Sequence, residues 1–177
     1  MPSLIITVLG PDRPGLVETV SDVVQQNGGN WLASRMAHLA GQFAGVVQVE
    51  VADENSDQLV SELRALSDKG LHVVVESDNS VPAVDDAAQL VTLNLIGGDR
   101  PGIVREVTQV LARRSVNVEE IQTDCVGAPM SGDRLFKANA RLRIPDGLTV
   151  EQLQEDLEQI ALDLMVDITL AKNAPSP

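Results

Sequence analysis

One six-residue string occurs twice in the chain and carries most of its recognisable chemistry. It reads Asp12-Arg13-Pro14-Gly15-Leu16-Val17 near the start and Asp99-Arg100-Pro101-Gly102-Ile103-Val104 in the second half. Each copy opens a stretch with helical periodicity, so its glycine and the next residue present backbone N–H groups at the positive end of a helix dipole. The neighbouring arginine adds a full positive charge. These are the donors that a carboxylate ligand needs.

A free amino acid also has an ammonium group, which requires oxygen acceptors. The aspartate of each string can supply one, and so can the asparagine that follows each predicted helix. The glycine of the string lets a ligand approach the backbone more closely than a residue with a Cβ would. The candidate ligand-binding residues are Asp12, Arg13, Gly15, Leu16 and Asn30 in the first copy and Asp99, Arg100, Gly102, Ile103 and Asn117 in the second.

The same string can also be explained as a well-formed helix start. Proline suits the first helical turn because no N–H is needed there, and Asp12 and Asp99 are placed to cap the N–H groups of Gly15 and Gly102. In this interpretation the arginines are solvated and the asparagines are turn residues. Duplication copies structure as well as binding sites, so both interpretations stay open.

Patterns typical of catalysis and metal binding are missing from the sequence. It contains no Gly-x-Ser-x-Gly, phosphate-binding loop or HExxH motif. The two histidines, His38 and His72, favour structural or surface roles, and the single Cys125 can form no intrachain disulfide. We expect that thiol to be buried or inert. The sequence therefore predicts no catalytic residues, no metal site and no cofactor.

Each string must be positioned by a strand before it and a helix after it. The first half provides a nearly continuous apolar run typical of a central strand. Apolar residues then recur at helical spacing from Pro14 until Asn27-Gly28-Gly29. The predicted elements are a strand at 4–9, this helix, strands at 30–39 and 43–51 joined near 40–41, a helix capped by Ser56 or Asp57 that ends at 69–70, and a strand at 71–75.

The second half repeats this order of elements. The two copies align without a gap from the aspartate of the string to Asn30 and Asn117, after which the second copy has a longer hairpin loop at 127–133. Beyond that loop Phe136 corresponds to Phe43. The outer sheet face carries Ala44, Val46, Gln48 and Glu50 in the first copy and Lys137, Asn139, Arg141 and Arg143 in the second.

A β-α-β-β-α-β order repeated twice predicts an α+β protein with two tandem ferredoxin-like domains. Each should have a four-stranded antiparallel sheet with its helices on one face. Residues 77–88 are small and polar and contain a proline, which is typical of a linker. We predict a first domain at 1–80, a linker at 81–88, a second domain at 89–172 and a flexible tail at 173–177.

Composition narrows the possible partners. The formal net charge is −13, with −9 in residues 1–88 and −4 in residues 89–177, so direct contact with nucleic acid is not expected. No apolar run is long enough to span a membrane, and no basic segment precedes the first apolar stretch. We expect a cytoplasmic protein without a membrane partner. Because the two halves differ in net charge, we also expect a homo-oligomer in which the first half of one chain pairs with the second half of another.

With Asp-Arg-Pro-Gly-Leu/Ile-Val between the first strand and first helix of each unit, and Asn opening the second strand, the chain resembles the ACT domain. The duplicated form, with a longer second hairpin, is similar to the glycine cleavage system transcriptional repressor family. The resemblance implies a regulatory module that binds amino acids or other small molecules, commonly at interfaces between paired domains. It also implies regulation through a protein partner, a transcriptional activator.

Three functions are therefore weighed. The first is a non-catalytic regulator that binds an amino acid such as glycine and modulates transcription of amino-acid metabolism genes through a protein partner. The second is a protein-interaction or oligomerisation module without a ligand. The third, an enzyme or an enzyme-associated regulatory subunit, is the least favoured because no catalytic constellation is visible.

Overall fold

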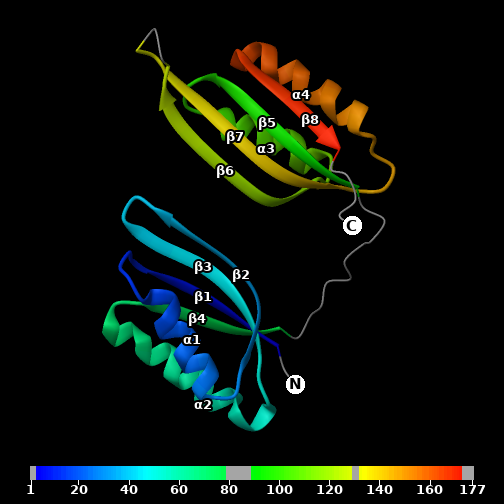
Figure 1. Cartoon of the computed structure of the whole chain (residues 1–177). Coiled ribbons are helices and arrows are strands. Elements are labelled where there is room, and N and C mark those ends of the chain that lie inside the picture. Colours follow the sequence, from blue (N-terminus) through cyan, green and yellow to red (C-terminus); the bar gives the residue numbers. More distant parts are fainter. Residues whose placement is uncertain (1–2, 79–88, 129–131, 173–177) are drawn as a thin grey trace. The chain divides into compact units, whose positions relative to one another are not determined.

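The computed structural model describes residues 3–78, 89–128 and 132–172. The chain divides into two compact units, residues 1–84 and 85–177. The predicted linker and the predicted tail lie outside the described residues, so the domain boundaries stay a prediction. Figure 1 labels the helices and strands of both units.

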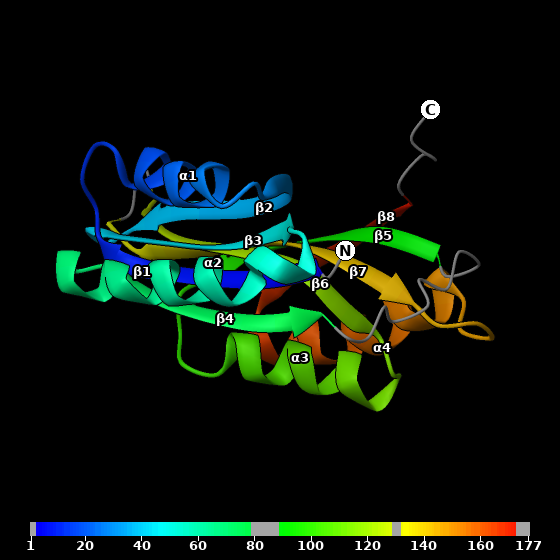
Figure 2. The same ribbon diagram turned by 90° about the horizontal axis from the view of Figure 1, so that it is seen from below.

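The first unit has one four-stranded sheet with the strand order β2-β3-β1-β4, in which all neighbours are antiparallel. Helices α1 and α2 cover one face of this sheet, and Figure 2 looks onto them. The elements are β1 (Ser3–Pro11), α1 (Leu16–Gln26), β2 (Asn30–Leu39), β3 (Gln42–Glu50), α2 (Asp53–Ala65), a short 3-10 turn η1 (Leu66–Lys69) and β4 (His72–Asp78).

The core of the first unit lies between this sheet and its helices. Leu4, Ile6 and Val8 alternate along β1 and are each 1% exposed or less, as expected for a central strand with one covered face. In β3 the inward set runs through Val47 and Val49, as the alternation predicted. From α1 and α2 the buried partners are Leu16, Val20, Val24, Leu59 and Leu63.

The β2–β3 hairpin turns where the sequence predicts it, whereas α2 begins earlier than predicted. The β2–β3 hairpin turns at Ala40 and Gly41, with φ of 50° and 78°, which is the left-handed pair that a tight two-residue hairpin needs. The prediction that Ser56 or Asp57 caps α2 is wrong. That helix begins at Asp53 after Ala52 and has no side-chain cap. Asp53 and Glu54 occupy its first turn, where carboxylates interact favourably with the helix dipole.

The second unit repeats the first, with the strand order β6-β7-β5-β8. Its own apolar core again lies between the sheet and two helices, and α3 aligns residue for residue with α1. The predicted two-domain α+β fold is therefore confirmed. The elements are β5 (Gln89–Gly98), α3 (Ile103–Arg113), β6 (Asn117–Gly127), β7 (Arg134–Ile144), α4 (Val150–Leu164) and β8 (Val166–Lys172). Of the longer hairpin loop, residues 129–131 lie outside the described residues.

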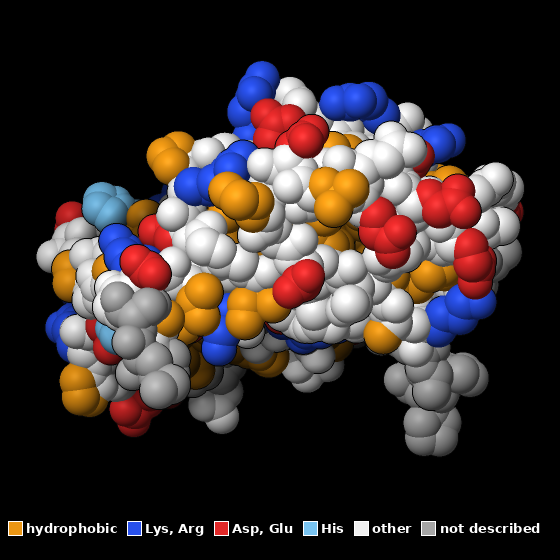
Figure 3. Space-filling view, turned by 90° about the horizontal axis from the view of Figure 1, so that it is seen from above, with side chains coloured by type: hydrophobic (Ala, Val, Ile, Leu, Met, Phe, Trp, Pro, Cys, Tyr) orange, Lys and Arg blue, Asp and Glu red, His pale blue; other side chains and the backbone are white. Residues whose placement is uncertain are grey.

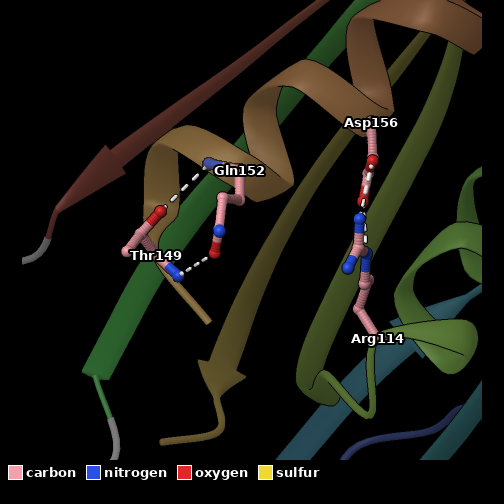
Figure 4. A network of polar contacts seen from close by, with 4 residues as sticks. All are labelled: Arg114, Thr149, Gln152 and Asp156. Carbon is pink, nitrogen blue, oxygen red and sulfur yellow. Dashed lines mark hydrogen bonds and ion pairs between the residues drawn. The ribbon is translucent and has the colours of Figure 1, made fainter. Parts of the chain in front are cut away.

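Helix α4 begins with a complete capping box. The hydroxyl of Thr149 accepts from the N–H of Gln152 at 3.2 Å, and the Gln152 side chain accepts from the N–H of Thr149 at 3.1 Å (Figure 4). Two of the donors that a helix N-terminus leaves without a partner are thus satisfied within the chain. The start of α4 therefore keeps fewer backbone donors free for a ligand.

Each unit ties the end of its first helix to its second helix by a polar contact. Asn27, which is buried, follows α1 and donates to Glu62 at 2.7 Å and to the carbonyl of Val23 at 2.9 Å. At the aligned position after α3, Arg114 donates to both carboxylate oxygens of Asp156, at 2.5 and 3.0 Å (Figure 4). The two units therefore keep the same connection with different chemistry.

Candidate functional site

The two repeated strings form the same strand-to-helix junction, and glycine decides its shape. Gly15 precedes α1 with φ 86° and ψ 6°, and Gly102 precedes α3 with φ 100° and ψ −11°. A positive φ of this size strains any residue with a Cβ. The helices therefore begin at Leu16 and Ile103, and the predicted place of the prolines in the first helical turn is wrong: they lie one residue before the N-cap.

The aspartates contact the hairpin and do not cap the helix. Neither α1 nor α3 has a side-chain cap, so the predicted bonds to the N–H groups of Gly15 and Gly102 are not formed. The N–H of Asp12 donates to the carbonyl of Gly41 at 2.9 Å, and its carboxylate lies 3.7 Å from His38. In the second unit the N–H of Asp99 donates to the carbonyl of Arg134 at 2.8 Å, and its carboxylate lies 3.7 Å from the same residue's guanidinium.

The arginines brace the junction on its other side. Arg13 donates to the carbonyl of Lys69 at 2.9 Å, and Arg100 donates to the carbonyl of Asp163 at 3.1 Å. Both acceptors lie at the C-terminal end of the unit's second helical segment, where carbonyls have no helical partner and a cation interacts favourably with the dipole. The arginines are thus neither simply solvated nor committed to a ligand, since each bond uses one of five donors.

Leu16 and Ile103 offer only their backbones to a ligand. Their side chains are 5% and 2% exposed and belong to the two cores. The first N–H groups of an α-helix have no acceptor within the helix, and at α1 and α3 no side chain supplies one. In contrast to the start of α4, these two junctions keep backbone donors available for an anion.

The two asparagines do not join the junction of their own unit. Asn30 pairs with Glu50, which pairs with Ser3 at the beginning of β1, whereas the junction follows Pro11 at the other end of that strand. The intervening length of strand is on the order of 26 Å at about 3.3 Å per residue. Asn117 is placed in the same way in the second unit. Neither asparagine can therefore reach the junction of its own domain, because the helix returns the chain to the far end of the sheet.

The structure also contains a hollow that sequence reasoning missed. It has a volume of about 540 Å³ and lies on the face of the second sheet that the helices leave uncovered. Alternation along each strand is the signal in the sequence that places Lys137 and Asn139 on this face. The polar residues that line the hollow are Asn94, Gln122, Thr123, Asp124, Lys137, Asn139, Asp167 and Thr169.

Two arginines on β7, which the sequence placed on that face, are engaged in ion pairs. Arg141 lies 3.5 Å from Glu119 and 3.4 Å from Glu120, and Arg143 donates to Glu119 at 2.6 Å. These contacts join β7 to its neighbour β6. The positive charge of these two arginines is therefore partly neutralised by neighbouring carboxylates.

Within residues 3–78, 89–128 and 132–172, no group of three or more His, Cys, Asp and Glu side chains could hold a metal ion. His38 accepts from the N–H of Gly41 at 3.2 Å and so takes part in the hairpin turn. Cys125 is exposed, not buried. Over the same residues no helix is both long and apolar enough to cross a membrane.

Models of known families match both halves of the chain. An ACT-domain model matches residues 3–76, and a second ACT-domain model matches residues 91–161. The chain belongs to the ACT-domain family. It contains two ACT domains in tandem, which agrees with the two units of the structure and with the resemblance drawn from the repeated strings.

Three proteins are similar to this chain in sequence or in structure. A UPF0237 protein of Methanococcus maripaludis is 31% identical over 84 residues, which are 45% of this chain and 91% of that protein. A protein of unknown function from Galdieria sulphuraria superposes with a TM-score of 0.86 at 29% identity, over 98% of this chain and 99% of the other. A structure provisionally named as a glycine cleavage system transcriptional repressor gives a TM-score of 0.69 at 23% identity, over 97% and 98% of the two chains. At that identity the last likeness concerns the tandem fold.

Proposed function

We propose that this tandem ACT protein is a non-catalytic regulator that binds a free amino acid, glycine being one candidate. Through a protein partner, a transcriptional activator, it modulates transcription of amino-acid metabolism genes. The observation that carries the proposal is the open helix start at both junctions. The backbone donors at the start of α1 and α3 have no side-chain cap, and an arginine precedes the Pro-Gly pair at each junction.

The carboxylate of an amino acid suits these donors, because it is an anion at the positive end of a helix dipole. Within the domain Asp12 or Asp99 can accept from the ammonium group, whereas Asn30 and Asn117 lie at the far end of their sheets, so an asparagine acceptor has to come from another domain. Strand β2 is an edge strand. If β2 paired antiparallel with β2 of a second copy, that strand of the partner would begin at the end of the sheet where the junction lies. The partner's Asn30, its first residue, would then lie near the junction. A homo-oligomer therefore completes the proposed site.

Charge favours a protein partner over direct contact with nucleic acid. The chain has a net charge of −13, which a phosphate backbone repels. Figure 3 shows acidic and basic side chains mixed over the side that it draws, with apolar side chains in small separate groups. A chain with a net negative charge and this mixture of surface side chains is compatible with regulation through another protein.

Calorimetry of the full chain with a panel of free amino acids tests the binding part. We expect saturable binding of at least one, glycine included in the panel, and a dimer or larger assembly by light scattering. The sharper test uses Val17→Pro with Val104→Pro. Proline removes one first-turn N–H at each junction and is tolerated in the first turn of a helix, and both valines are about half exposed, at 45% and 44%.

The matched control is Val17→Ala with Val104→Ala, which shortens the same side chains and keeps the N–H groups. The proline pair should weaken binding by about tenfold or more, because a hydrogen bond to a charged group contributes about 1.5–3 kcal/mol. The alanine pair should bind like the parent chain. Equal binding by both pairs, or no binding of any amino acid by folded protein, would refute the proposed site.

A second function, an interaction module without a ligand, is favoured by one specific observation. The charged side chains of both strings contact their own unit: the aspartates contact the hairpin and the arginines contact the second helix. The strings would then only stabilise the strand-to-helix junction of each domain. Recovery of the partner in equal amounts with and without amino acids would support this function over the first.

A further inference from the structure

We infer that the uncovered face of the second sheet holds a separate binding site for a small zwitterion, namely a free amino acid with a carboxamide side chain. The inference goes beyond the proposed function, because the site lies on the sheet face and not at the helix starts. Its volume of about 540 Å³ falls within the range of pockets that hold small molecules.

The first argument is a row of neutral polar side chains across all four strands. Gln122 of β6 lies opposite Asn139 of β7, Asn139 lies opposite Asn94 of β5, and Asn94 lies opposite Thr169 of β8. The amide of Asn139 donates to the amide oxygen of Asn94 at 2.7 Å. An amide has two N–H donors and a carbonyl acceptor, so this row can both donate to and accept from a carboxamide.

The second argument is a parallel row of charges beside the amides. Asp124 of β6 lies opposite Lys137 of β7, Lys137 lies opposite Ile96 of β5, and Ile96 lies opposite Asp167 of β8. Among the described residues Lys137 has no ion pair within 4 Å. A lysine between two carboxylates can receive a ligand's carboxylate, while Asp124 or Asp167 receives its ammonium group.

The corresponding face of the first sheet shows that these groups are not a general property of the fold. The strand registers place Ala44 where Lys137 stands, Val46 where Asn139 stands and Val74 where Thr169 stands. All three side chains are exposed, so apolar side chains interrupt both rows on the first sheet. Among the described residues, the amide row with an unpaired lysine beside it is therefore a feature of the second face and not of the first.

The test is a titration of the ¹⁵N-labelled full chain with L-asparagine and L-glutamine, followed by the amide signals. Glycine, which lacks the carboxamide, and acetamide, which lacks the charges, serve as comparison probes. We expect saturable shifts in residues 94–96, 122–124 and 137–139 with the two carboxamide amino acids. Glycine and acetamide should need at least about tenfold higher concentrations, since each lacks hydrogen bonds that the others make.

Lys137→Met should weaken this binding by about tenfold, because it removes a charge-assisted hydrogen bond. The matched control is Arg35→Met, which removes an exposed cation from the corresponding face of the first sheet and should leave binding unchanged. Asn94→Leu is the second variant, which removes the centre of the amide row without changing charge. This variant should also weaken the binding of asparagine and glutamine, with little effect on the binding of glycine.

The outcomes separate this inference from the proposed function. Shifts confined to residues 15–18 or 102–105 would overturn the sheet-face site and support the junction. Shifts on the sheet face alone would support the inference and count against the junction. Binding that Lys137→Met and Asn94→Leu leave unchanged would overturn the inference, and so would no binding of either carboxamide amino acid.

Discussion

At the scale of single residues, the repeated strings connect the strand-to-helix junction to the rest of their own unit. The aspartate connects the junction to the hairpin, the arginine connects it to the end of the second helix, and the glycine supplies a left-handed backbone between them. Because both units make equivalent contacts with different partner residues, structure alone can explain the repetition. A ligand uses what they leave open, the first N–H groups of α1 and α3.

Gly102→Ala should destabilise the second unit by about 1–2 kcal/mol, since its φ of 100° puts a Cβ into the left-handed region. Nothing lies within 4 Å of that Cβ, so crowding is not the cause. Gly98→Ala is the control, because it has the same open space without the positive φ. Urea unfolding followed by circular dichroism measures both. Gly102→Val would be strained in the same way, so a loss of binding in that variant could come from lower stability and not from blocked ligand access.

Arg100→Met should lower the stability of the second unit by about 1 kcal/mol or less, because it removes one exposed hydrogen bond to the carbonyl of Asp163. If Arg100 acts as a brace alone, amino-acid binding by calorimetry will not change. A loss of binding of about tenfold or more with an unchanged unfolding midpoint would instead assign the guanidinium to the ligand's carboxylate.

At the scale of elements, each helix pair is fastened at one end by a polar contact. In the second unit the bonds from Arg114 hold the pKa of the Asp156 carboxyl below its ordinary value. In the first unit, bonds from Gln58 and Asn27 lower the pKa of Glu62. A carboxyl with a lowered pKa in the folded state stabilises the fold above its unfolded pKa, and this contribution is lost as the pH falls through the folded pKa.

Asp156→Asn tests this connection through pH. At pH 7 the variant should unfold at a lower urea concentration than the parent chain, since it loses the charged pair with Arg114. As the pH falls from about 5 towards 2, across the ordinary carboxyl pKa of about 4, the parent chain loses the same contribution and the two midpoints should converge. A difference that stays constant over this pH range would show that the ion pair does not produce it.

At the scale of the whole molecule, stability is divided between two separate cores. Each unit buries its own set of apolar side chains between one sheet and two helices. No strand is shared between the two sheets. Each unit thus has what an independently folding domain requires.

Residues 1–80 and 89–172, produced separately, should each fold cooperatively. Amide spectra of each fragment should be well dispersed, and each should show a single unfolding transition in urea. Domains of this size are only marginally stable, so midpoints are expected to be modest. A fragment with the collapsed spectrum of an unfolded chain would contradict the independence of the two cores.

The sequence by itself determined the elements and the duplication. The alternation of Val47 and Val49, the helical spacing in α1 and the repeated glycines are local patterns, and local sterics and burial decide them. The sequence does not place the start of α2, because several residues there suit a helix N-terminus and the helix begins without a side-chain cap.

Tertiary structure alone decided which residues meet. The helix between β1 and β2 returns the chain to the opposite end of the sheet, so Asn30 lies far from the junction that it follows in sequence. The same sheet brings Asn94, Asn139 and Lys137 onto one face, although they come from separate strands. Spacing along the chain contains no information about such pairings, because strand order and register fix them.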